Sequence, residues 1–276
     1  MIEFRNVHAA YDDQLPVLRD VSFTIDDGEF VAFVGTNGAG KSTTMRLMNG
    51  LLKPSEGTVL LNGTPTTELR TSEIARKVGF LFQNPDRQIC CNTVREELLF
   101  GFKAQGRLDE QAQEKVDAMI AHFNFDAEAE QFLLHRGTRQ LLALASILVT
   151  EPEVLILDEP TTGLDYRECC KVMEVIECAH QKGTTVVMVC HDLPDVFAVS
   201  DRIVVIRQGH VTGVHRTVET SYEEIIAEIA GVTTEHEYEE IAENPKFDSM
   251  VRQRKLIDRT ISAAVSHGTG HDSPLD

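Results

Sequence analysis

Strand-like alternation of apolar and polar residues occupies the start of the chain. It runs over residues 2–7 and 21–25, and turn-forming residues separate the two stretches. Such alternation is typical of strands with one buried face, so we expect an antiparallel pair. The next stretch, Phe30 to Val34, is apolar throughout, as in a strand covered on both faces. A glycine-rich turn follows it and leads into a helix-favouring stretch, Lys41 to Met48.

The spacing of apolar residues along the sequence changes twice in the rest of the chain. From Val94 to about Leu148 it is helical, which predicts a helical insertion over about 94–150. Two continuous apolar strands follow at 154–157 and 185–189, and a helical pattern lies between them. Helices between buried strands predict a parallel α/β sheet. A last pair of strands, 202–206 and 210–214, is expected to turn at Gln208-Gly209.

Composition narrows the class of protein. The 276 residues include 44 acidic and 26 basic side chains, and the formal net charge of −18 argues against nucleic acid or anionic lipid held by bulk charge. The six cysteines form neither a CxxC knuckle nor a spaced disulfide framework, so we expect a reducing cytosol. The longest apolar run, 141–149, is too short for a membrane span.

An acidic segment follows the last predicted strand. Nine glutamates and no lysine or arginine lie between Thr217 and Pro245. A solvated helix face with a linker is one interpretation, and an acidic docking surface for a partner is the other. We expect two parts, a domain over 1–216 and an acidic C-terminal extension and tail over 217–276, frayed after Ser266.

The glycine-rich turn fits the pattern GxxxxGK[ST]. Its glycines let successive backbone N–H groups point at phosphate oxygens, the lysine adds a cation near the terminal phosphates, and the serine hydroxyl can ligate Mg²⁺. The expected strand before it and the helix after it support a phosphate-binding loop. The candidate ATP-binding residues are Gly35, Thr36, Asn37, Gly38, Ala39, Gly40, Lys41, Ser42 and Thr43.

Hydrolysis needs groups beyond a phosphate cradle, and an acidic pair supplies them. Asp158 follows the apolar strand 154–157, where its carboxylate can hold the hydration shell of the metal. Glu159 comes next and can orient or deprotonate the attacking water. Asp-Glu pairs are common at helix starts, but the apolar strand before this pair and Pro160 after it favour the metal-and-base interpretation.

Together, the loop at 35–42, the segment 155–165 and Cys190-His191-Asp192 resemble the ATPase subunit of an ABC transporter. The resemblance covers residues 1 to about 215. It implies a P-loop NTPase core of class α/β with a mainly parallel sheet, an N-terminal antiparallel β subdomain, a helical insertion and a C-terminal extension. It also implies ATP and Mg²⁺ as cofactors.

The resemblance assigns further roles. Gln83 matches the glutamine that reaches the metal and the attacking water, so the metal set becomes Ser42, Gln83 and Asp158. His191 matches the histidine that contacts the γ-phosphate, although a histidine at a strand end is often structural. Tyr11 matches the aromatic residue that stacks on adenine, with ordinary packing as the alternative. The segment Gly163, Leu164 and Asp165 matches the loop that crosses to a second subunit.

One motif departs from the family pattern. Such ATPases bind each ATP between one subunit's phosphate loop and the other's signature, LSGGQ or a close variant. The matching segment here consists of Leu134, His135, Arg136, Gly137 and Thr138, in which only Leu134 and Gly137 fit. His135 and Arg136 are large where small residues are usual, so we expect an asymmetric pair with a different, related subunit. A working homodimer that tolerates the substitutions is the alternative.

The segment 82–101 is similar to the ATPases of energy-coupling factor (ECF) importers for vitamins or transition-metal ions. In that family a membrane subunit docks after the glutamine, so 90–99 is the expected docking groove, or else merely an amphipathic surface. We expect a transmembrane coupling subunit and a substrate-binding membrane subunit as partners, no nucleic acid, and a peripheral place on the cytoplasmic face of the cell membrane. An importer for another solute, such as an amino acid, and a soluble non-transport ABC protein remain open.

Overall fold

A computed structural model describes residues 1–11 and 16–232 of the chain. It divides into two units, Met1–Thr220 and a second unit that begins at Ser221. In the second unit, Ser221 caps helix α8 (Tyr222–Ala230) and Gly231 ends it in a left-handed conformation. The acidic stretch predicted between Thr217 and Pro245 therefore begins within described residues, and its part beyond residue 232 lies outside them, as does the tail.

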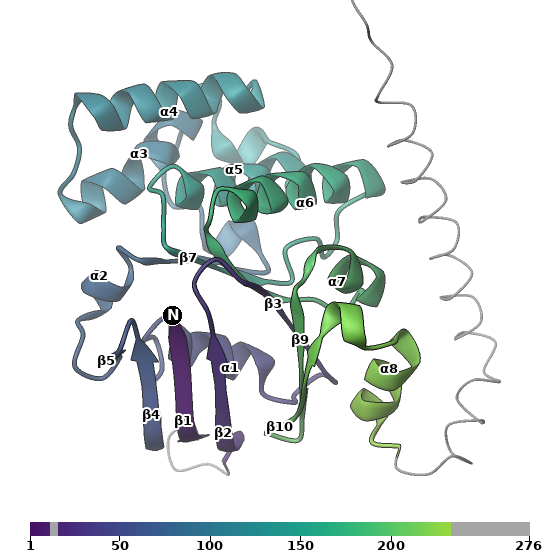
Figure 1. Ribbon diagram of the computed structural model, residues 1–276. Coiled ribbons are helices and arrows are strands. Elements are labelled where there is room, and N and C mark those ends of the chain that lie inside the picture. The colour runs from purple at the N-terminus through teal and green to yellow at the C-terminus, as the bar shows by residue number, and fades with distance from the viewer. Residues whose placement is uncertain (12–15, 233–276) are drawn as a thin grey trace, which may run out of the picture. The chain divides into compact units, whose positions relative to one another are not determined.

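An antiparallel sheet of four strands forms the start of the first unit, in the order β2-β1-β4-β5 (Figure 1). Strand β1 (Ile2–Ala9) pairs antiparallel with β2 (Leu18–Ile25), as the alternating pattern predicts. On its other side β1 pairs with β4 (Glu56–Leu61), which pairs with β5 (Thr64–Pro65). Strand β4 is not evident from the sequence, because its first half, Glu56, Gly57 and Thr58, is not apolar.

A second sheet of six strands has the order β10-β9-β3-β8-β7-β6. The four parallel pairings join β9, β3, β8, β7 and β6, and β10 closes an antiparallel hairpin on β9. The strand bounds are β3 Phe30–Val34, β6 Val78–Leu81, β7 Val154–Asp158, β8 Thr185–Val189, β9 Arg202–Arg207 and β10 His210–Arg216. Every residue of β3 and β8 is buried, which explains their continuous apolar sequence.

The two sheets share one hydrophobic core. Helix α1 (Lys41–Met48) contributes Met45, Leu47 and Met48 to it, together with apolar residues from β1, β2 and β4 of the first sheet and from β3, β7, β8 and β9 of the second. Within this core the ring of Phe23 stacks on Phe4, with centroids 4.5 Å apart, and meets Phe33 edge-to-face, with centroids 5.4 Å apart. This packing fixes α1, and the loop before it, against the parallel sheet.

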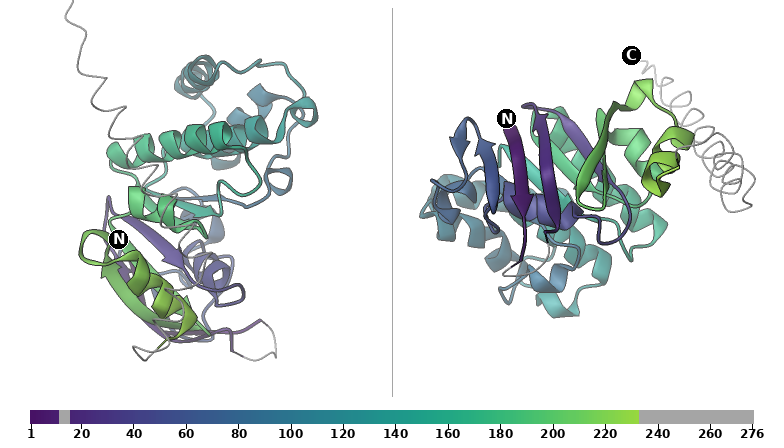
Figure 2. Two further views of the ribbon diagram at one scale, coloured as in Figure 1. Left: turned by 90° about the vertical axis from the view of Figure 1, so that its right-hand side faces the viewer. Right: turned by 90° about the horizontal axis from the view of Figure 1, so that it is seen from below.

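A helical region follows β6, as the 3.6-residue period predicts. Figure 1 and Figure 2 show its three helices grouped to one side of the sheets. They are α3 (Val94–Gln105), α4 (Glu110–Phe123) and α5 (Arg136–Leu148). The remaining elements of this unit are α2 (Thr71–Ile74), α6 (Tyr166–Gln181), α7 (Leu193–Val199), and the 3-10 helices η1 (Pro85–Arg87), η2 (Gln131–Leu133) and η3 (Thr217–Glu219).

Helix α5 lies directly on the edge strand β6. A Cβ atom on Gly79 would overlap with Cγ2 of Ile147 and lie 3.3 Å from Cγ of Pro152. The absence of a side chain at Gly79 is therefore what allows the helix to approach the strand so closely.

We predict that Gly79→Ala lowers the free energy of unfolding by about 1–3 kcal/mol, because the added methyl group overfills this contact. Urea denaturation measures the change. The double variant Gly79→Ala/Ile147→Ala should cost less than the sum of the two single variants, since removal of Cγ2 makes room for the new methyl group. Additive costs would contradict this account of the contact.

Candidate active site

The phosphate-loop motif lies between the carboxyl end of β3 and the first turn of α1. At Gly35 the backbone φ is 147°, and a Cβ atom there would overlap with the carbonyl oxygen of Ile206, so the loop needs glycine at this position. Gly40 precedes α1 in a left-handed conformation. All candidate residues from Gly35 to Thr43 therefore occupy one curled loop and the N-terminal turn that follows, where N–H groups and the helix dipole favour an anion.

Lys41 is 6% exposed and lies against the loop that precedes it. Its Nζ donates to the carbonyl oxygens of Gly35 at 2.7 Å and Thr36 at 3.0 Å. Burial lowers the pKa of the Lys41 ammonium group, and the carboxylates of Glu159 and Asp158 oppose that change. The cation and the two carboxylates thus belong to one electrostatic cluster.

Asp158 ends β7 beside the first turn of α1. Burial and the neighbouring Glu159 raise the pKa of the Asp158 carboxyl, whereas a hydrogen bond with the Ser42 side chain and the charges of Arg46 and Lys41 lower it. The structure therefore brings Ser42 and Asp158 together, as the sequence predicts. Their hydroxyl and carboxylate oxygens are hard ligands of the kind that Mg²⁺ prefers.

Glu159 receives hydrogen bonds from side chains on both neighbouring strand ends. Nε2 of Gln83, just beyond β6, donates to Oε2 at 2.7 Å, and Nε2 of His191, just beyond β8, lies 2.7 Å from Oε1. Thr162 donates its hydroxyl to Oε2 at 3.0 Å. The order β8-β7-β6 explains the convergence, because the carboxyl ends of adjacent parallel strands meet at one edge.

The backbone of Glu159 is itself unusual. Its φ is 51°, a left-handed conformation for a residue with a side chain, and its N–H donates to the carbonyl oxygen of Val189 at 3.0 Å. Such strain persists where the surroundings fix it, and it clusters at functional sites. Sequence reasoning did not identify Thr162; its place three residues after Glu159, in the turn at the end of β7, was the available signal.

Tyr11 packs against the helix that begins with Lys41. Its hydroxyl group lies 3.2 Å from Oγ1 of Thr43, and the guanidinium group of Arg46 lies 5.9 Å from the ring centroid and donates to the hydroxyl oxygen at 3.2 Å. The structure thus places Tyr11 next to the phosphate loop. Sequence reasoning missed Arg46, which follows Ser42 by one helical turn and faces the same site.

The signature-like segment contacts the loop after β7 of its own chain. His135 precedes α5 without a side-chain cap, and Arg136 donates to the carbonyl oxygen of Thr162 at 3.0 Å. The Arg136 guanidinium group also lies against Gly163, and Gly137 packs against Glu168. Among the described residues, no hydrogen bond joins Leu134, His135, Arg136, Gly137 or Thr138 to the phosphate loop.

The segment Gly163, Leu164 and Asp165 connects this contact to helix α6. The Asp165 carboxylate accepts the N–H of Glu168 at 2.9 Å, and the Glu168 carboxylate accepts the N–H of Asp165 at 3.1 Å. This reciprocal pair is a capping box that fixes where α6 begins. Tyr166, the next residue, is 75% exposed.

Gln88 links the segment just beyond β6, which carries Gln83, to the helical region, a role that sequence reasoning did not assign. Its Oε1 accepts the N–H of Phe82 at 3.1 Å, and its Nε2 donates to the carbonyl oxygen of Ala143 in α5 at 3.1 Å. The residue next to Gln83 is thereby connected to the helix that carries the signature-like segment.

Comparison with known proteins gives relatives along most of the chain. A putative ABC transporter ATP-binding protein of Pyrococcus furiosus is 38% identical over 213 residues, which are 76% of this chain and 82% of the relative. An energy-coupling factor transporter ATP-binding protein of Enterococcus faecalis is 38% identical over 218 residues, 77% of each chain. A putative ABC transporter ATP-binding protein of Caldanaerobacter subterraneus is 37% identical, but this chain spans only 37% of its length.

Solved structures agree with these relatives. The structure of cbiO1 from Clostridium perfringens, part of the ABC transporter complex cbiONQ, is 28% identical with a TM-score of 0.73 and covers 86% of this chain and 97% of that one. A dimeric ATP-binding cassette in a post-hydrolysis state with ADP and Pi is 26% identical with a TM-score of 0.70, over 79% and 99% of the two chains. These likenesses confirm the predicted α/β cassette with its mainly parallel sheet and antiparallel β subdomain.

The family model described as ABC transporter matches residues 18–162, which include the phosphate loop, Gln83 and the Asp158-Glu159 pair. The chain therefore belongs to the ABC transporter family and is one of its ATP-hydrolysing cassettes.

Proposed function

We propose that this cassette is the energy-coupling ATPase subunit of an ECF-type importer whose cargo is a vitamin or a transition-metal ion. The similarity to the Enterococcus relative and to clostridial cbiO1 supports this assignment. The observation that carries the ATPase role is the convergence of Gln83, Thr162 and His191 on the Glu159 carboxylate.

In the proposed reaction, the loop from Gly35 to Thr43 binds the phosphates of ATP and Lys41 neutralises charge near the terminal phosphate. Tyr11 stacks on the adenine. Glu159 orients the attacking water and accepts its proton, while His191 holds the Glu159 carboxylate and contacts the γ-phosphate. Because Gln83 and His191 approach the two oxygens of one carboxylate, its direction is fixed before the substrate arrives.

Magnesium is the metal that these residues fit. The Ser42 hydroxyl, the Asp158 carboxylate and the amide oxygen of Gln83 would hold it, and all three are hard oxygen donors. Burial raises the pKa of Asp158, so a nearby divalent cation would favour its ionised form. When bound, the ion would neutralise charge that develops on the phosphate oxygens during hydrolysis.

We further propose that the chain pairs with a different, related ATPase. In a head-to-tail pair, a signature serine and a bare glycine backbone approach the partner's γ-phosphate, and here His135 and Arg136 occupy these positions. The contact of Arg136 with Thr162 and Gly163 supports a rearranged signature, because it turns the guanidinium group toward its own chain. The partner's phosphate loop would then face the weaker of two unequal sites.

Segment 90–99 is the proposed docking groove for the membrane subunit, at the cytoplasmic face of the cell membrane. Phe100, which directly follows this segment in the sequence, is 46% exposed and provides apolar surface. Among the described residues no helix is both long and apolar enough to span a bilayer. Gln83 and the helical region would transmit the closing and opening of the ATPase pair to the membrane subunits.

We predict that Glu159→Gln leaves ATP binding within about threefold of wild type but lowers turnover by at least about 100-fold, because the amide cannot accept a proton from water. Phosphate release and nucleotide binding are both measured on the purified assembly. Glu174→Gln, an exposed change on α6, is the matched control and should keep full turnover. Undiminished hydrolysis by Glu159→Gln would remove Glu159 from the mechanism.

Lys41→Ala should weaken both binding and turnover.

The signature proposal predicts low ATP turnover for the purified chain alone. The double variant His135→Ser/Arg136→Gly restores small residues, so it should raise turnover of the isolated chain by about tenfold or more. Thermal melting and ATP binding of the variant verify that it folds. A wild-type chain that is already fully active as a homodimer would contradict the proposal.

Co-purification from membranes tests the importer assignment. Affinity capture of the full chain from detergent-solubilised membranes should yield a second ATP-binding cassette together with membrane-spanning proteins, identified by mass spectrometry. Recovery with a soluble assembly that contains no membrane protein would overturn the assignment, and it would leave the ATPase role intact.

A further inference from the structure

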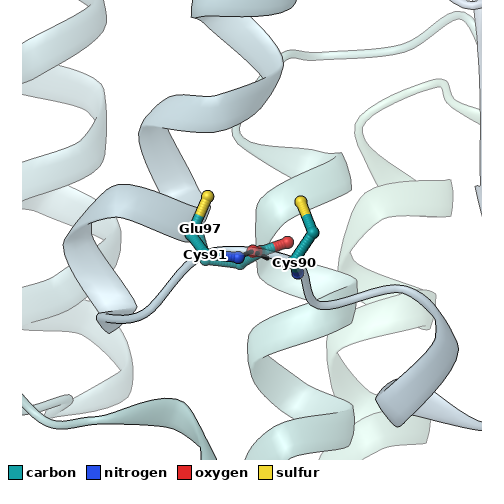
Figure 3. Close-up of side chains that lie close together, drawn as sticks. All are labelled: Cys90, Cys91 and Glu97. Atoms are coloured by element: carbon teal, nitrogen blue, oxygen red, sulfur yellow. Dashed lines mark hydrogen bonds between the residues drawn. The ribbon is translucent and has the colours of Figure 1, made fainter.

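Two adjacent cysteines and a buried carboxylate from the first turn of α3 form a cluster at the start of that helix. Cys90, Cys91 and Glu97 each place one potential ligand atom within 4.8 Å of the other two. Figure 3 shows the two sulfur atoms on the same side of the turn, with the Glu97 carboxylate near both residues. The sequence contains no CxxC motif, so the pairing of these thiols with Glu97 emerges only from the fold.

The turn that carries the thiols is held rigidly. The Glu97 carboxylate accepts the backbone N–H groups of Cys90 at 3.0 Å and Cys91 at 2.9 Å through the same oxygen, Oε2. Glu96 accepts the next two N–H groups, those of Asn92 and Thr93, at 3.3 Å each. Because four successive N–H groups are fixed by two glutamates, the thiols need little reorganisation to act together.

Glu97 is a buried carboxyl group, and no cationic side chain among the described residues is paired with it. It is 3% exposed, and in the described part of the chain no lysine, arginine or histidine forms an ion pair with it. Burial and the Glu97 carboxylate raise the pKa of both thiols, that of Cys91 to about 12, so both are protonated at neutral pH. A buried carboxylate next to two thiols is an environment that a cation would stabilise.

We propose that Cys90, Cys91 and Glu97 form a binding site for a thiophilic divalent cation of the zinc type. Two sulfur ligands select a soft or borderline ion over Mg²⁺, and the carboxylate oxygen is the third ligand. In tetrahedral coordination two sulfur ligands lie about 3.8 Å apart, which the present separation allows after small side-chain rotations. Binding converts both thiols to thiolates and releases their two protons to water.

The exposed side of the cluster leaves room for a fourth ligand. Cys90 is exposed and Cys91 partly exposed, so water can complete the coordination. The cysteines also begin the segment 90–99, so an ion bound here would stand on the surface proposed for the membrane subunit. The metal site itself rests on the three side chains and does not depend on that proposal.

Metal titration of the full-length chain tests the site. The chain is reduced with a phosphine, and Zn²⁺ is titrated against a chromophoric chelator in millimolar Mg²⁺, which occupies oxygen-ligand sites without competing for thiolates. We expect one equivalent to bind with a Kd below about 1 μM. Titration with Co²⁺ should give the near-ultraviolet thiolate-to-metal absorption and the intense visible bands of a tetrahedral site.

Variants assign the binding to these residues. Cys90→Ser/Cys91→Ser should weaken Zn²⁺ binding by at least about 100-fold and abolish the Co²⁺ thiolate band, and Glu97→Gln should weaken binding by about 10- to 100-fold. The matched control is Cys170→Ser/Cys178→Ser, which removes two other exposed thiols and should bind like wild type. Thermal melting verifies that each variant folds.

Three outcomes would overturn the proposal. They are a wild-type chain that takes up no Zn²⁺, a Cys90→Ser/Cys91→Ser variant that binds as tightly as wild type, and a Glu97→Gln variant whose affinity is unchanged. A Cys90–Cys91 disulfide that resists reduction by the phosphine would also leave the wild-type chain unable to take up Zn²⁺, so it would count as the first outcome.

Discussion

Three strand ends meet at the carboxylate of Glu159, and the rest of the site depends on that meeting. The parallel order β8-β7-β6 puts the residues that follow each strand side by side, so that Gln83 and His191 reach the same side chain from opposite directions. The backbone of Glu159 adopts a left-handed conformation there, and its N–H is held by the carbonyl oxygen of Val189. A fixed carboxylate is useful for hydrolysis, because its orientation needs no adjustment during the reaction.

The substituted signature segment gives the same loop a second set of contacts. Arg136 binds the carbonyl of Thr162, and the hydroxyl of Thr162 binds Glu159. The residue that departs most from the usual small-residue pattern is thus two hydrogen bonds away from the proposed base. The substituted signature segment and Glu159 are therefore connected within one chain.

Local sequence identified the features that depend on neighbours along the chain. The phosphate loop, the fully buried strands β3 and β8, and Asp158 at the end of β7 all follow from residue type and spacing over a few positions. The relation between Ser42 and Asp158 was also predictable, because both follow strands that a parallel sheet aligns. The roles of Gln83, His191 and Tyr11 came from family resemblance, since none of these residue types indicates a function alone.

Features that depend on contacts between residues far apart in the chain could not be predicted from the sequence. Strand β4 begins with Glu56 and Gly57, and it is a strand because β1 and β5 pair with it on both sides. The direction of the Arg136 side chain depends on the loop after β7, which lies 26 residues away in the chain. Similarly, Glu97 follows the two cysteines by seven and six residues, and only the fold of the intervening residues brings its carboxylate back to their N–H groups.

The Gln88 side chain has a mechanical consequence. It ties the backbone of Phe82 to Ala143 in the middle of α5, while Gly79 lets the same helix rest on β6 without an intervening side chain. Helix α5 and strand β6 are therefore coupled at two points, one through the Gln88 hydrogen bonds and one through the close contact at Gly79, and Gln83 lies just beyond this coupled strand. A displacement of α5 would therefore be transmitted to the backbone next to Gln83, whose side chain donates to Glu159.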